Sequence, residues 1–396
     1  MADVVLRRFQ PLHLKLEKVG PFRGPFEMAL TGPGEQPANF FLLASKNGFG
    51  KTTLLETIYS LMGALAPSNF QDRPPLPHPD LLKDGKAQLD IRVELESQNK
   101  AATIILSLIV DNELERPLRT LTPSLLEEAQ ADAWVPLRAN TMGRLSINPI
   151  SLLNLDVRGI VEPLLKVIAE GNDQDQRFSP TNALLLPTVL YFPADRRILS
   201  PKDGPRAITQ PDLAYRPAHK FMTDGQTWET SLDGLLVWYE WLGGGLLDQT
   251  RDLVNSLMFD TAKDSDHAPR YPRKRLLGID RHRLGAVIEV EYEDGSTYHH
   301  GLDRLSHGER SLMHLLVRSA YHRSGSTILM IDEMETHLHP RWQHRVMTML
   351  KDWIRQWPDL TIIATTHQPE MMDAFAFERP EADLVKGGHL IEASNL

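Results

Sequence analysis

Asp332 and Glu333 are the residues of this sequence that most clearly require a chemical partner, because they stand directly after an apolar segment, residues 327–331. Ile328 and Ile331 are β-branched, and the segment predicts a short strand buried on both faces. In an open α/β sheet, ligands bind at the C-terminal ends of strands. Burying two carboxylates there without a cation would be costly. The pair therefore predicts a metal or phosphate site whose other residues lie elsewhere in the chain.

A glycine-bearing loop that could supply this partner lies near the start of the chain, at residues 45–53. An apolar strand is predicted before it, at residues 39–44, and residues 54–59 have helical spacing after it. This strand–loop–helix order is the context that the phosphate-binding motif G-x-x-x-x-G-K-[ST] requires. Ser45 stands at the position of the first glycine of that motif, a departure that would tighten the loop.

The residue types in this loop suit the binding of phosphate. Gly48 and Gly50 let backbone N–H groups turn inward around an anion, and the N-terminus of the following helix adds partial positive charge. We expect Lys51 to reach the β- and γ-phosphates of a nucleotide and the Thr52 hydroxyl to bind Mg²⁺.

Length and composition favour a globular protein with two or three domains, or one large bilobed domain, since 396 residues are 41% hydrophobic and 24% charged. No apolar run has the length of a membrane span, and the first residues lack the apolar core of a signal peptide. We therefore expect a cytoplasmic protein with no membrane association. The absence of cysteine excludes disulfides, thiolate metal sites and cysteine nucleophiles. The net charge of −9 means that any nucleic-acid binding must come from a local patch.

The order of predicted elements indicates an α/β fold. Strand and helix alternate towards the C-terminus, as expected for a parallel sheet covered on both faces. Residues 88–95 and 102–110 predict an antiparallel layer beside this core. Residues 111–186 have a weakly helical pattern, with the better helices at 124–133 and 160–170. The expected division is an N-terminal core part at 1–110, a helical insertion lobe at 111–187 and a C-terminal core part at 188–396.

One basic cluster, residues 270–275 with Arg281 and Arg283, stands out from the acidic balance of the chain. A solvated basic loop is one interpretation, and a contact for nucleic acid or for an acidic partner is the other. A zinc site is not expected, because three neighbouring histidines lack further ligands at convincing spacing: His337, His339 and His344.

Two further segments could contact phosphate. Residues 305–310 place Ser306 and Gly308 at the start of a predicted helix, where Ser306 taken alone would be an ordinary N-cap. His367 follows the apolar segment 361–366, which predicts a last core strand. Taken alone, His367 would be a strand-end histidine without a ligand.

The order of these motifs resembles the ATP-binding-cassette (ABC) ATPase heads of the RecF and SMC class, and residues 305–310 resemble the signature motif of that class. Residues 335–340 and 191–196 resemble the group that contains OLD-type bacterial anti-phage ATPases. The resemblance covers residues 10–110 and 185–395. It implies a bilobed ABC ATPase head: a mixed sheet flanked by helices, an antiparallel β layer and a helical insertion lobe.

The resemblance also implies a role for each motif position. Glu333 would polarise the attacking water as general base, and His367 would contact the γ-phosphate of ATP; these two are the expected catalytic residues. Thr52 and Asp332 would bind Mg²⁺. ATP would be held by the phosphate loop of one subunit and by the signature motif of a second, through Asn47, Gly48, Gly50, Lys51, Thr52 and Thr53 in the loop and Ser306 and Gly308 in the signature motif. No segment is an obvious match for the glutamine-bearing loop of this class.

The signature assignment implies a homodimer, or a higher homo-oligomer, that closes head to head on two ATP molecules and opens on hydrolysis. No sustained heptad pattern lies between Lys51 and Ser306, so a long coiled-coil arm is not expected. The segment after His367 is too short for the nuclease domain of OLD proteins. We expect an ATPase that senses a trigger and controls a separate effector, a nuclease or a toxin, in anti-phage defence. A RecF-like DNA-binding repair ATPase and a non-hydrolysing, nucleotide-bound scaffold are the alternatives.

Overall fold

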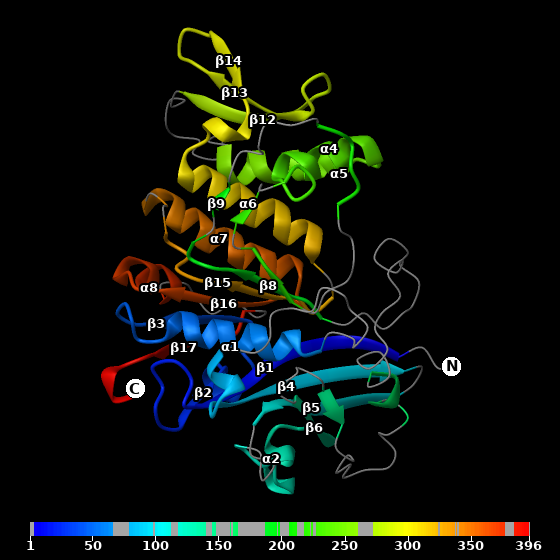
Figure 1. The fold of residues 1–396 in the computed structure, drawn as a ribbon, viewed down its shortest axis with the longest axis vertical. Coiled ribbons are helices and arrows are strands. Elements are labelled where there is room, and N and C mark those ends of the chain that lie inside the picture. Colours follow the sequence, from blue (N-terminus) through cyan, green and yellow to red (C-terminus); the bar gives the residue numbers. More distant parts are fainter. Residues whose placement is uncertain are drawn as a thin grey trace.

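The computed structural model describes residues 4–65, 79–97, 100–111, 118–139, 145–147, 159, 161–164, 187–195, 197–198, 206–211, 218–221, 223–224, 227–259, 272–323, 325–336, 338, 340–376 and 384–395. Figure 1 shows these parts as stacked layers, with a large sheet at one end, a parallel sheet in the middle and a small outer sheet at the other end.

The middle layer is a six-stranded sheet in which every pairing is parallel. Its four inner strands are buried along their whole length and consist mainly of apolar residues, as expected when both faces of a parallel sheet are covered. In spatial order the strands are β10 (Ala218–Lys220), β8 (Val189–Phe192), β15 (Ile328–Ile331), β16 (Thr361–Thr366), β3 (Phe40–Ala44) and β17 (Lys386–Leu390).

Alternate residues of these strands enter two different cores. Ile328 and Met330 pack on the side of helix α1 (Lys51–Gly63) and the large sheet, whereas Leu329 and Ile331 pack on the opposite side. That opposite side is covered by α6 (His307–His322), α7 (Pro340–Gln356) and α8 (Pro369–Ala376), as Figure 1 shows. The helices therefore bury both faces of the parallel sheet, as predicted.

The large sheet has the order β2–β1–β4–β5–β6–β7 and is antiparallel except for the pairing of β5 with β6. It confirms the antiparallel layer expected beside the core. Its strands are β1 (Val4–Glu17), β2 (Phe26–Ala29), β4 (Lys86–Ser97), β5 (Lys100–Val110), β6 (Ala133–Ala139) and β7 (Leu145–Ile147).

The outer sheet is an antiparallel meander of three strands that lies over two helices at the top of Figure 1. The strands are β12 (Arg273–Asp280), β13 (Gly285–Glu291) and β14 (Thr297–His300), and the helices are α4 (Leu232–Leu242) and α5 (Leu246–Val254). Strands β13 and β14 form a hairpin, and β12 is the edge strand on the other side of β13. A separate two-stranded pairing joins β9 (Arg197–Ile198) and β11 (Thr223–Asp224).

The described part of residues 111–187, expected to be a helical lobe, contains the strands β6 and β7 besides short helical segments. The helix predicted at 124–133 is the short α2 (Pro123–Glu128), and residues 133–139 form β6, which pairs in parallel with β5. Trp134 and Val135 are buried in the sheet, so burial across strands outweighs the weak helical pattern. Residues 161–164 are helical, and the rest of the helix predicted at 160–170 lies outside the described residues.

The α/β fold class is confirmed by the parallel sheet with its two layers of helices and by the antiparallel layer. Within the described ranges, no helix is both long enough and apolar enough to cross a membrane.

Candidate functional site

The candidate site lies at one edge of the parallel sheet, where three neighbouring strands end. Strands β3, β16 and β15 are adjacent and parallel, so the phosphate loop after Ala44, Asp332 after β15 and His367 after β16 all follow the same edge. The C-terminal edge of a parallel sheet is the usual place for a ligand. Three of the motifs predicted from the sequence are thus brought to one place by the strand order.

The phosphate loop closes around the Lys51 ammonium. Lys51 Nζ lies 2.9 Å from the Ser45 carbonyl oxygen, 3.2 Å from that of Lys46 and 3.3 Å from Ser45 Oγ. Burial lowers the pKa of Lys51, whereas the nearby carboxylates of Glu333, Asp332 and Glu335 act to raise it. Ser45 therefore contributes a hydroxyl contact to the lysine that the usual glycine could not make.

The two glycines of the loop have left-handed backbone, with φ of +83° at Gly48 and +89° at Gly50. A Cβ atom on Gly50 would lie 2.7 Å from the Phe22 ring, so the turn between β1 and β2 packs directly on the loop. Asn47 and Gly48 are exposed at the tip of the loop. The Thr53 side chain lies beneath Gly20 of the same turn.

Thr52 and Asp332 are in direct contact although they lie 280 positions apart in the chain. Thr52 Oγ1 donates to Asp332 Oδ2 at 2.7 Å, and Asp332 is 1% exposed. Hydroxyl and carboxylate oxygens are the ligands that Mg²⁺ takes, usually together with substrate phosphates. Within the described ranges no group of three or more histidines and carboxylates could hold a metal ion. The pair therefore fits a Mg²⁺ ion that enters with a nucleotide.

Thr365 on β16 fixes both carboxylate residues, a role that the sequence did not reveal. Its hydroxyl donates to Asp332 Oδ1 at 2.6 Å and accepts from the Glu333 backbone N–H at 2.7 Å. Glu333 has a φ of +45°, which is rare for a residue with a side chain and costs free energy. The half-buried Glu333 carboxylate accepts a hydrogen bond from Thr336 Oγ1 at 3.1 Å. Thr365 and Thr336 thus hold Glu333 in a strained, defined position.

Glu335 fixes the position of His367, a contact that the sequence did not reveal. Glu335 Oε1 accepts the His367 backbone N–H at 2.9 Å and lies 2.9 Å from His367 Nδ1. Glu335 is 2% exposed, and its Oε2 is buried with no hydrogen-bond partner among the described residues. Since Nδ1 faces the carboxylate, Nε2 is the ring nitrogen left for a ligand. Two signals pointed to Glu335: it follows Glu333 by two residues, and it begins the segment 335–340 that resembles anti-phage ATPases.

Ser306 and Gly308 lie at the N-terminus of α6, and no hydrogen bond joins either residue to the phosphate loop in the described part of the chain. Ser306 is indeed the N-cap: its Oγ accepts the Glu309 N–H at 3.3 Å, and Glu309 Oε2 accepts the Ser306 N–H at 2.8 Å. Ser306 is exposed, whereas Glu309 is buried. Ser306 therefore caps α6 at an exposed position, whereas Gly308 is buried.

The basic cluster is largely neutralised by carboxylates. Ion pairs join Lys274 to Glu309 at 2.7 Å, Arg275 to Glu289 at 2.5 Å, Arg281 to Glu240 at 2.6 Å and Arg283 to Asp280 at 3.9 Å. The predicted cluster members Arg270 and Tyr271, and the histidines His337 and His339, lie outside the described residues.

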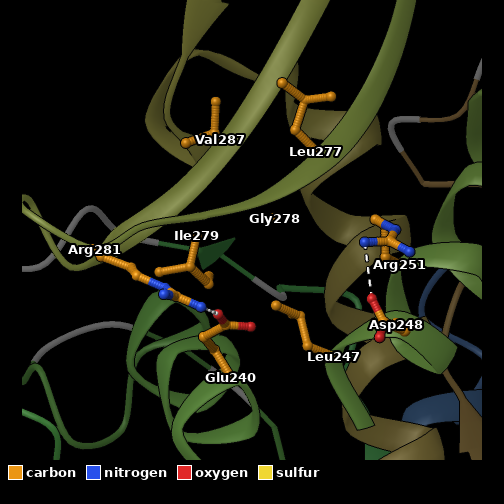
Figure 2. Close-up of a pocket in the computed structure, with 9 residues that line it drawn as sticks. All are labelled: Glu240, Leu247, Asp248, Arg251, Leu277, Gly278, Ile279, Arg281 and Val287. Atoms are coloured by element: carbon orange, nitrogen blue, oxygen red, sulfur yellow. Dashed lines mark hydrogen bonds and ion pairs between the residues drawn. The ribbon is translucent and has the colours of Figure 1, made fainter. Parts of the chain in front are cut away.

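Two hollows lie on the outer sheet, away from this edge. One of about 390 Å³ is drawn in Figure 2, where the Arg281–Glu240 and Arg251–Asp248 pairs flank an apolar floor that includes Leu247. The other, of about 420 Å³, is polar and is lined in part by Arg206, Asp233 and Arg283. Neither contains a residue of the predicted site.

Comparison with solved structures gives low similarity. The SMC head domain from Thermotoga maritima aligns over 92% of both chains with 12% identity and a TM-score of 0.33. An SmcHead bound to the C-winged helix domain of ScpA aligns over 92% of this chain and 91% of that chain, with 11% identity and a TM-score of 0.39.

Among curated proteins, a short segment of the chain is similar to a protein named for a defence system. The chain is 43% identical over 49 residues to the Septu protein PtuA of Bacillus thuringiensis, and the match covers 12% of this chain and 12% of that protein.

A protein-family model matches most of the chain. The family is described as "AAA domain, putative AbiEii toxin, Type IV TA system", and its model matches residues 46–373, from the phosphate loop to α8. An AAA domain is a phosphate-loop ATPase domain, which implies nucleotide binding at the loop described above. The chain belongs to this family of AAA-domain proteins.

Proposed function

We propose that the chain hydrolyses ATP to ADP and phosphate as an ABC-type ATPase, with Glu333 and His367 as its catalytic residues. The contact between Thr52 and Asp332 carries the proposal, because it joins the phosphate loop to the strand end that bears Glu333. Phosphoryl transfer needs positioning and charge neutralisation more than covalent help from protein groups.

Each side chain at the sheet edge has a distinct task in this proposal. Glu333 accepts a proton from the attacking water, and Thr365 fixes its backbone during the reaction. Lys51 exchanges its contacts with the loop carbonyls for phosphate oxygens. His367 donates from Nε2 to the γ-phosphate while Glu335 holds Nδ1. Mg²⁺ at Thr52 and Asp332 would neutralise charge on the phosphates.

The signature segment acts in the second subunit of a head-to-head homodimer, or of a larger homo-oligomer. The exposed Ser306 hydroxyl and the N–H groups at the start of α6, near Gly308, suit an anion such as the γ-phosphate of the partner's ATP. In this proposal residues 1–110 and 188–396 form the ATPase head and residues 111–187 an insertion.

We place the protein in the cytoplasm, where its ATP-driven assembly controls a separate effector in anti-phage defence. The family description names a toxin and a toxin–antitoxin system, which supports a toxic effector as the partner; a nuclease is the other kind of effector that we expect. The resemblance of residues 335–340 to anti-phage ATPases supports the same setting.

A DNA-binding role is disfavoured by the ion pairs of the basic cluster, since phosphate contacts would first have to displace Glu309, Glu289, Glu240 and Asp280. A non-hydrolysing scaffold is disfavoured by the strained and doubly held position of Glu333.

Phosphate release from Mg-ATP tests the proposed activity. Lys51→Met should abolish nucleotide binding, whereas Glu333→Gln should bind Mg-ATP normally and release phosphate at least about 100-fold more slowly. Glu370→Gln, at an exposed position in the first turn of α8, is the matched control and should behave as wild type. Equal phosphate release by Glu333→Gln and wild type would refute the general-base role.

A further inference from the structure

Lys274 is the member of the basic cluster that reaches the signature segment. Its Nζ lies 2.7 Å from Glu309 Oε1, and the two side chains are 26% and 11% exposed. Side chains alternate along a strand, so Lys274 shares a face of β12 with the buried Leu276. Arg275 lies on the other face, with its side chain 62% exposed and paired with Glu289.

The carboxylate that Lys274 contacts is the one that organises Ser306. Glu309 uses Oε1 for Lys274 and Oε2 for the Ser306 N–H, while its own N–H is accepted by Ser306 Oγ. Burial alone would raise the pKa of Glu309, but the hydrogen bonds from Lys274 and Ser306 lower it below its usual value. Glu309 is therefore a buried anion beside the serine, and Lys274 is its counterion.

The position of Lys274 is set by the contact between β12 and α5. Asn255, which directly follows α5, donates from Nδ2 to the Leu276 carbonyl at 3.0 Å and accepts the Leu276 N–H at 2.7 Å. Leu276, whose backbone makes both hydrogen bonds, lies two residues from Lys274 on β12. The outer sheet is thereby tied to α5 on one side and, through Lys274, to the start of α6 on the other.

We propose that Lys274 is a positioning residue for the signature serine. It fixes Glu309 and cancels its charge, so that Ser306 can donate to the anionic γ-phosphate of ATP held by a second copy of the chain. An uncompensated carboxylate next to Ser306 would repel that phosphate. The inference rests on the head-to-head assembly proposed above, and it couples the outer sheet to the closing of the dimer.

The test compares five variants of the full chain for Mg-ATP affinity at low protein concentration, for solution mass in Mg-ATP, and for phosphate release. Lys274→Met should keep its affinity for Mg-ATP but lose about tenfold in assembly and in turnover. Lys274→Arg should retain both, and Arg275→Met, one residue away on the opposite face, should match wild type.

Neutralising Glu309 separates the proposed role from a general loss of structure. Glu309→Gln keeps an oxygen acceptor for the Ser306 N–H, as in the usual capping box, but removes the charge. In the Lys274→Met background it should recover most of the lost assembly, because no unpaired buried carboxylate then remains.

Four outcomes would overturn the inference. Wild-type behaviour of Lys274→Met, in a chain that does assemble with Mg-ATP, would remove the role of Lys274 and leave the proposed function intact. An equal loss in Arg275→Met, or no recovery in the double variant, would reduce the pair to a structural contact. A wild-type chain that neither assembles nor releases phosphate would refute the proposed function and this inference together.

Discussion

At the scale of single residues, the Thr365 hydroxyl holds both acidic residues of the proposed site. It donates to the Asp332 carboxylate and accepts the N–H of the strained Glu333. Without that acceptor, Glu333 would lose a buried backbone partner and relax from its left-handed conformation.

Thr365→Val should therefore lower the rate of ATP hydrolysis about 100-fold, since small displacements of a catalytic group have effects of that size. Mg-ATP affinity should fall less, because the contacts of the phosphate loop remain. Steady-state phosphate release and equilibrium nucleotide binding measure the two effects.

Thr361→Val is the matched control on the same strand. Thr361 is 2% exposed, and in the described part of the chain its Oγ1 has no hydrogen-bond partner, so removing this hydroxyl should leave activity unchanged and stability equal or higher. Comparable losses of activity in the two variants would show that β16 is merely sensitive to valine.

Most site residues could be predicted from the sequence, but their supporting residues could not. Lys51, Thr52 and Asp332 stand in motifs whose spacing is visible along the chain. Thr365 and Glu335 act only because β16 lies beside β15, and strand adjacency is not encoded in local sequence.

At the scale of elements, the turn between β1 and β2 forms part of the phosphate-loop structure. Pro21 and Phe22 leave no room for a Cβ atom on Gly50, with contacts of 2.8 and 2.7 Å. Gly48 has an equally positive φ, but a Cβ atom there would meet nothing within 4 Å. Substituting Gly48 therefore tests backbone strain alone, whereas substituting Gly50 tests backbone strain together with steric crowding.

Gly48→Ala should cost only the strain of a left-handed alanine, about 1 kcal/mol. Gly50→Ala should cost more in unfolding free energy and should also abolish Mg-ATP binding, because the loop must move away from Phe22. Denaturant unfolding and nucleotide titration measure both quantities. Equal effects at the two positions would contradict the packing of this turn on the loop.

A pH-dependent element lies on the large sheet, where His13 of β1 is mostly buried. Burial and the nearby Arg119 lower its pKa from 6.5 to about 4, although Glu27 acts in the opposite direction. Between pH 4 and pH 6.5, His13 is therefore protonated in the unfolded chain and neutral in the folded chain. The unfolding free energy should fall as the pH drops from 6.5 to 4, by about 1–3 kcal/mol from this group.

His13→Gln should remove that part of the pH dependence. The measurement is denaturant unfolding of both proteins at several pH values between 4 and 7. A difference between variant and wild type that is constant over this range would contradict the assignment to His13.

The order of core elements was predictable, whereas the 111–187 range was not. Apolar strands such as β15 and β16 are recognisable because both faces are buried. β6 contains Pro136 and depends on pairing with β5, a contact between segments about thirty residues apart. In the described part of the chain β7 pairs only with residues 137–139, so Pro136 lies where β6 is an edge strand that tolerates proline.

At the scale of the whole molecule, the layers place the two expected nucleotide-contacting surfaces on different elements. The phosphate loop and Asp332 follow strands of the parallel sheet, whereas Ser306 begins α6 and is tied through Glu309 to the outer sheet. No hydrogen bond joins the two surfaces within the described chain, which is the arrangement that a second subunit would complete.

The sequence suggested that the phosphate loop and the signature segment are separate nucleotide-contacting segments, but it did not show which residues connect the signature segment to the outer sheet. The signature segment was recognisable from residues 305–310, whereas three of the four ion pairs of the basic cluster join residues from separate elements. Lys274 and Glu309, 35 positions apart, meet only because β12 packs near the start of α6. From the sequence alone, the two interpretations of the basic cluster were a solvated basic loop and a contact for nucleic acid or for an acidic partner.

The most direct test of the central claim is the mass of the protein in solution, with and without Mg-ATP, for wild type and for Glu333→Gln. We expect a larger species in Mg-ATP, which Glu333→Gln retains after wild type has hydrolysed its nucleotide and separated. Ser306→Arg, which blocks the exposed N-cap, should bind Mg-ATP without forming that species. A mass that stays the same for every variant and every nucleotide state would contradict ATP-driven head-to-head assembly.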